Sequence, residues 1–142
     1  MRFITRVIAI TFLISGLLTA QDIVGRWVGV ADTTDEASTK RHERQTLEIK
    51  SEDGKLTGVR FNRSGNGGIP IEVQQDGAKV NLYGFLTLDG GEHLRWKLEL
   101  KDGKLVGTFS AQHDNPKKWI YDRIGPMTLT KAAPQAVAPD AK

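Results

Sequence analysis

Hydrophobic and polar residues alternate with a period of two along much of this chain. In His93–Leu100, leucine or tryptophan occupies every even position, and polar or charged residues occupy the odd ones. Lys79–Leu88 shows the same pattern, with apolar residues at positions 80, 82, 86 and 88. This alternation is typical of antiparallel strands with one buried face. No long segment has the periodicity of a helix.

Eight segments carry strand character, and Asp-Gly turn signals separate many of them. An Asp-Gly pair between alternating segments favours a tight hairpin, because both central residues of a type I′ turn need positive φ. Short sequential strands of this kind fit an up-and-down barrel. The chain therefore predicts an all-β, eight-stranded antiparallel barrel with strands at Ile23–Ala31, Gln45–Lys50, Lys55–Asn62, Ile69–Gln75, Lys79–Leu88, His93–Leu100, Lys104–Ala111 and Pro126–Lys131.

Two of the predicted hairpins repeat one another. Leu47–Gly58 and Leu98–Gly107 each contain a strand, an Asp-Gly turn and then Lys-Leu-x-Gly. A glycine in the return strand permits a bend or a close backbone approach, and a sheet that curls into a barrel needs such positions.

Two connections are longer than the others. Asp32–Arg44 is polar, with acidic residues leading and basic residues trailing, which suits one short helix by the helix dipole. Gln112–Tyr121 contains Pro116 and the basic pair Lys117-Lys118. We expect these two segments to flank one mouth of the barrel.

The N-terminal segment has the composition of an export signal. Arg2 and Arg6 precede the uncharged apolar run Val7–Leu18, and small residues end at Ala20. The run is shorter than the roughly 20 apolar residues of a relaxed membrane span. We therefore expect residues 1–20 to be a cleaved signal helix, residues 21–131 to be one barrel domain, and residues 132–142, rich in Ala and Pro, to be a disordered tail in a periplasmic or secreted protein.

Cleavage at Ala20 changes the charge that matters for partners. The full chain carries 20 basic and 17 acidic residues, and loss of Arg2 and Arg6 leaves 18 against 17, a net charge of +1. Such a balance gives no reason to expect a nucleic acid partner. The absence of cysteine excludes disulfides, thiolate metal sites and cysteine nucleophiles.

The start of the first predicted strand carries Gly25-x-Trp27-x-Gly29. With the hairpin repeats and the closing strand up to Lys131, the chain resembles small exported bacterial β-barrels of the lipocalin and calycin type. The resemblance implies that Trp27 packs across one barrel end, beneath a basic side chain from the last strand, either Lys131 or Arg123. The chain lacks the Thr-Asp-Tyr motif and C-terminal helix of lipocalins.

The sequence displays no arrangement of residues that supports catalysis. It has no Gly-x-Ser-x-Gly elbow, and its histidines, His42, His93 and His113, lack the close spacing of metal ligands. His42 and His113 lie in the two long connections, where Glu43 and Asp114 adjoin them. We expect neither a catalytic residue, nor a metal, nor a cofactor.

Arg60 is the residue whose direction matters most. Aligned by the hairpin repeat, Leu56, Gly58 and Arg60 correspond to Leu105, Gly107 and Phe109. If that strand runs without interruption, Arg60 points inward, and a buried guanidinium indicates an anionic ligand. A bulge after Gly58 would instead bury Phe61 and turn Arg60 outward, and we favour the bulge because it hydrates a charge.

These observations predict a monomeric, exported, non-catalytic binding or interaction module. One alternative is a barrel with a ligand site, for which Arg60, Tyr83, Trp119 and Tyr121 are the candidate contacts and the ligand is an unidentified small molecule. The other is an envelope inhibitor or accessory protein with a filled barrel that acts through its surface. The size of the interior distinguishes the two.

Overall fold

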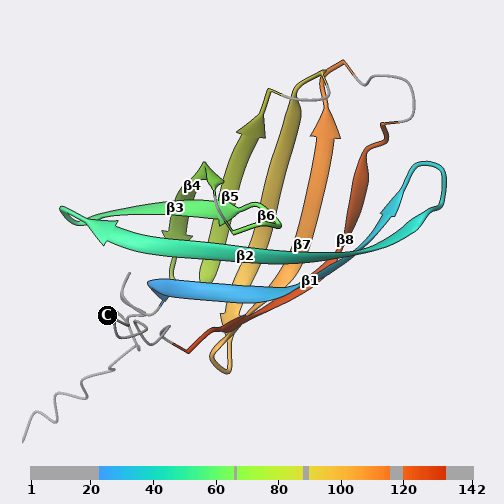
Figure 1. Cartoon of the computed structure of the whole chain (residues 1–142). Coiled ribbons are helices and arrows are strands. Elements are labelled where there is room, and N and C mark those ends of the chain that lie inside the picture. The colour runs from blue at the N-terminus through green and yellow to red at the C-terminus, as the bar shows by residue number, and fades with distance from the viewer. Residues whose placement is uncertain (1–22, 66, 88–89, 116–119, 134–142) are drawn as a thin grey trace, which may run out of the picture.

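A computed structural model describes residues 23–65, 67–87, 90–115 and 120–133. These residues form a closed antiparallel barrel in which each strand pairs with the next and β8 pairs with β1 (Figure 1). The strands are β1 (Gly25–Asp35), β2 (Lys40–Glu52), β3 (Lys55–Phe61), β4 (Gly68–Asp76), β5 (Lys79–Leu86), β6 (Glu92–Lys101), β7 (Lys104–His113) and β8 (Arg123–Lys131). The predicted all-β, eight-stranded up-and-down barrel is confirmed. The expected signal helix and most of the expected tail lie outside the described residues.

The hairpin turns follow from the Asp-Gly signals. Asp53 and Gly54 have φ values of 51° and 77°, and Asp102 and Gly103 have 51° and 75°, so both turns of the repeated hairpins place two residues in the left-handed region. Gly107 permits a close approach, because a Cβ atom there would lie 1.9 Å from the Lys97 carbonyl oxygen. The repeat thus encodes one hairpin geometry used twice.

The predicted helix in Asp32–Arg44 is wrong. β1 continues to Asp35, β2 begins at Lys40, and the two strands form a long hairpin that extends past their neighbours (Figure 1). The Asp35 carboxylate accepts hydrogen bonds of 2.9 Å from the backbone N–H groups of Ala37 and Thr39, and Ser38 adopts a φ of 64°. Asp35 therefore closes a tight turn instead of capping a helix.

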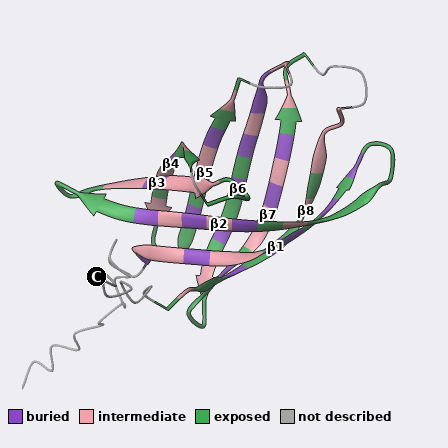
Figure 2. Cartoon of the chain, viewed as in Figure 1, coloured by how far each residue is buried: buried purple, intermediate pink, exposed green. Residues whose placement is uncertain are grey.

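Buried and exposed residues alternate along the strands (Figure 2). The inward residues divide the interior into two ends. One end is apolar, and large buried side chains fill it, with Trp27 across it. The other, near the β1–β2, β3–β4, β5–β6 and β7–β8 connections, is polar. We call it the polar end and define it by its inward residues Thr33, Glu43, Gln45, Arg60, Glu92, His113 and Arg123.

The motif at the start of β1 builds the apolar end. Trp27 is 1% exposed, and its indole Nε1 donates a 2.8 Å hydrogen bond to the carbonyl oxygen of Ile23. Lys131 lies opposite Trp27 in the β1–β8 ladder, with its Nζ atom 5.8 Å from the indole centroid. A Cβ atom on Gly25 would lie 2.7 Å from the Lys131 side chain, and one on Gly29 would lie 2.0 Å from the Thr128 carbonyl oxygen. Both glycines thus keep β8 close to β1.

Candidate functional site

A network of buried charges lies at the polar end, centred on Arg123. Its guanidinium donates hydrogen bonds of 2.8–2.9 Å to both oxygens of Glu43 and one of 3.1 Å to Glu92. These three side chains are only 9–15% exposed. Thr33 donates a further 2.7 Å hydrogen bond to Glu43. The network joins β1, β2, β6 and β8 across the barrel.

The Arg123 network shifts the pKa values of Glu43 and Arg123. Burial alone raises the pKa of the Glu43 carboxyl, but the hydrogen bonds from Arg123 and Thr33 and the charge of Arg123 outweigh burial, so the pKa of Glu43 is lowered. For Arg123, burial acts in the opposite direction and lowers the pKa. The hydrogen bonds and charges of Glu43 and Glu92 outweigh this effect of burial, so the pKa of Arg123 is raised. Both groups are therefore held in their charged forms.

His113 extends the network to the barrel rim. Its side chain is 1% exposed, with Nδ1 3.0 Å from the Asp122 carboxylate and Nε2 3.6 Å from that of Glu92. His42, in contrast, points outward and pairs with Asp32. The two histidines of the long connections therefore do not meet, and the described residues contain no group of three or more His, Cys, Asp or Glu placed to hold a metal ion.

Arg60 points into the polar end, and the favoured bulge is absent. The β2–β3 ladder is uninterrupted, pairing Leu47 with Arg60 and Ile49 with Gly58. Arg60 thus occupies the inward position that Phe109 holds in the repeated hairpin. The expectation that a charge turns outward was wrong because the pleat of an unbroken strand fixes its direction.

Arg60 differs from Arg123 in having no direct partner. Its Nε atom is fully buried, and among the described residues Arg60 forms neither a hydrogen bond nor a salt bridge. Burial lowers its pKa, the charges of Glu92 and Glu43 oppose that effect at longer range, and the charge of Arg123 adds to it. A buried N–H group without an acceptor is costly, so the protein itself supplies no hydrogen bond that offsets the burial of Arg60 Nε.

The wall of the barrel is open on both sides of Arg60. The β2–β3 ladder ends at Leu47–Arg60, so residues 40–46 of β2 pair with β1 alone. The β4–β5 ladder ends at Ile71–Gly84, so residues 68–70 and 85–86 do not pair with each other. The part of the β3–β4 hairpin next to its connecting loop is therefore paired with neither β2 nor β5. Arg60 and Ile69 pair with each other at the point where these two ladders end.

Two cavities occupy these openings, and Arg60, Phe61 and Asn62 line both. The larger, of about 540 Å³, lies toward β2 and is completed by His42, Glu43, Arg44, Thr46 and Arg63. The smaller, of about 290 Å³, lies toward β5 and is completed by Gly68, Ile69 and Leu86. The guanidinium that lacks a protein partner therefore borders space that a small molecule can enter.

The structure does not bring the other predicted contacts to Arg60. Tyr83 lies on the outer wall, where its hydroxyl is 2.7 Å from His93 Nδ1 and Arg95 lies 5.4 Å from its ring centroid. Tyr121 is half-buried between β7 and β8 and lines neither cavity. Trp119 lies outside the described residues.

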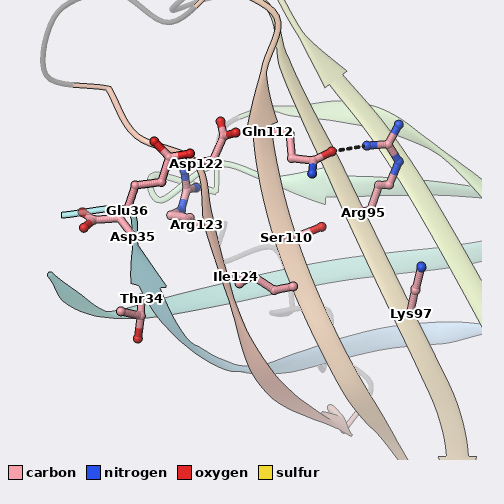
Figure 3. Close-up of a pocket in the computed structure, with 10 residues that line it drawn as sticks. All are labelled: Thr34, Asp35, Glu36, Arg95, Lys97, Ser110, Gln112, Asp122, Arg123 and Ile124. Carbon is pink, nitrogen blue, oxygen red and sulfur yellow. Dashed lines mark hydrogen bonds between the residues drawn. The ribbon is translucent and has the colours of Figure 1, made fainter. Parts of the chain in front are cut away.

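A third cavity, of about 670 Å³, lies on the outer wall over β6, β7, β8 and the end of β1 (Figure 3). Its charged groups are largely engaged already. Arg95 donates a 3.0 Å hydrogen bond to Gln112, and Asp35 and Arg123 have the partners described above. This groove offers no buried polar group without a partner, so it is a weaker candidate than the polar end.

Comparison of the chain with protein-family models, with curated proteins and with solved structures finds no match. Among the described residues, no helix is long and apolar enough to cross a membrane. The functional argument therefore rests on the geometry of the polar end.

Proposed function

We propose that this protein is an exported, non-catalytic binding module of the lipocalin-like type, and that its barrel takes a small molecule at Arg60. The observation that carries the proposal is the inward Arg60 side chain, whose buried Nε atom has no hydrogen-bond partner and which lines two cavities. A ligand oxygen at this position would supply the hydrogen bonds that the protein does not.

The interior supports this proposal over a barrel that acts only through its surface. The apolar end is filled by large side chains, as the surface-acting alternative expects. The polar end has open wall on both sides of Arg60 and space beside it. Ligand sites typically combine a mostly preformed cavity with a few convergent polar groups, which describes the polar end.

Native mass spectrometry of the protein purified from the envelope fraction of the cells that make it tests the proposal. We expect a small additional mass on the wild-type protein that Arg60→Met lacks. Lys104→Met is the matched control, because Lys104 is an exposed cation at the opposite end of the barrel, and it should retain the mass. A wild-type protein without added mass, or a mass that Arg60→Met retains, would overturn the assignment.

A further inference from the structure

We propose that the ligand is a small carboxylic acid, with its carboxylate on Arg60 and Gln45 and its apolar part against Ile69 and Leu86. This inference deepens the proposed function and rests on it. Three independent features of the polar end support it: the donors without partners, the sign of the charge around the larger cavity, and the apolar lining of the smaller one.

The first feature is a second donor beside Arg60. Gln45 is 2% exposed, and its Oε1 accepts a 2.7 Å hydrogen bond from Trp96 Nε1. An indole nitrogen only donates, so this bond fixes which amide atom is the oxygen. The remaining Nε2 is buried without a partner. Among the described residues, buried side-chain atoms without a hydrogen-bond partner are confined to Gln45 Nε2 and Arg60 Nε.

These two donors lie on one face of neighbouring strands. Leu47 pairs with Arg60, and Gln45 is the next inward residue of β2, so Gln45 and Arg60 are diagonal neighbours at the end of the β2–β3 ladder. Both groups need an acceptor. A carboxylate accepts several hydrogen bonds in one plane and matches the fork of a guanidinium, which makes it the strongest partner available to this pair.

The second feature is charge. Three arginines, Arg44, Arg60 and Arg63, line the larger cavity, and its one carboxylate, that of Glu43, is already held by Arg123. Positive charge around a partly enclosed cavity attracts anions. An anion entering from the β2 side therefore meets two exposed arginines, Arg44 and Arg63, beside the half-buried Arg60.

The third feature separates a carboxylic acid from an inorganic anion. On the opposite side of Arg60, the smaller cavity is lined by Phe61, Ile69 and Leu86. A carboxylate bound to Arg60 can place a short hydrocarbon chain against Ile69 and Leu86, and each buried methylene contributes about 0.8 kcal/mol. Phosphate and sulfate have no group to occupy that space.

Titration of the ¹⁵N-labelled full chain with butyrate, butyramide and inorganic phosphate tests the inference. The Trp96 indole N–H reports on the site, because it bonds to Gln45, and the Trp27 indole N–H at the apolar end is the internal control. We expect butyrate to shift the Trp96 signal saturably and leave Trp27 unchanged. Butyramide should bind about tenfold more weakly, the difference between a charge-assisted and a neutral hydrogen bond.

Gln45→Glu is the sharpest variant, because it keeps an oxygen for Trp96 and replaces the free donor with a carboxylate oxygen. We expect it to weaken butyrate binding at least about tenfold, while Lys104→Met leaves binding unchanged. Equal affinity for butyramide, tighter binding of phosphate, or no saturable shift with any probe would each overturn the carboxylic-acid inference. The mass measurement above decides separately whether the site holds a ligand at all.

Discussion

Replacing Trp27 by alanine is expected to lower the free energy of unfolding by about 3–5 kcal/mol, the range for truncation of a buried large aromatic side chain. Trp27 closes the apolar end, makes a buried hydrogen bond to Ile23 and packs beneath Lys131. All of these contacts are lost together in the variant. Equilibrium unfolding in urea measures the change.

Ile124→Ala is the control for that experiment. Ile124 is 59% exposed on the same barrel wall, and its truncation should change the free energy of unfolding by no more than about 0.5 kcal/mol. A Trp27→Ala protein as stable as the wild type would contradict the assignment of Trp27 to the packed end of the barrel.

Replacing Arg123 by methionine should also cost about 3–5 kcal/mol, for a different reason. The change leaves the carboxylates of Glu43 and Glu92 buried without their shared cation. A triple variant that adds Glu43→Gln and Glu92→Gln removes those charges and should recover part of the loss. If Arg123→Met alone is as stable as the wild type, the network contributes nothing to the fold.

The pH dependence provides a second check on Arg123. The pKa of Glu43 is lowered in the folded protein from its ordinary value of 4.5. A carboxyl with a lowered pKa contributes stability above its unfolded pKa, and that stability is lost as pH falls through its folded pKa. The penalty of Arg123→Met should therefore be large at neutral pH and shrink below about pH 4.5.

The sequence predicts the strands and several turns, because both depend on interactions between residues that are close together in the chain. The alternation in His93–Leu100 predicts which face of β6 is buried, and Asp53-Gly54 predicts a hairpin turn with positive φ. The helix expected in Asp32–Arg44 failed because charge order along a polar segment is a weak signal. The backbone hydrogen bonds between β1 and β2 in this segment stabilise the strands, and they outweigh the weak helical preference that the charge order indicates.

The polar end was only partly predictable. The sequence indicates that the direction of Arg60 decides whether the barrel has an anion site. The cost of burying a charge predicts that Arg60 points outward, which is wrong. The same cost makes the inward Arg60 a candidate binding residue. Glu92 and Arg123 were missed as partners, although each has the same parity as the inward residues of its strand, Leu94 and Met127. Their contact depends on closure of the barrel, which no local pattern encodes.

The stability of Arg60→Met, measured by urea unfolding of the ligand-free protein, tests the central claim most directly. We hold that Arg60 is kept buried for binding, since Arg123 already engages Glu43 and Glu92. The variant should therefore be at least as stable as the wild type, because an apolar side chain replaces a half-buried charge whose Nε atom is buried without a hydrogen bond. A loss of about 3 kcal/mol or more, as for breaking a buried ion pair, would show that Arg60 is structural and would contradict the account.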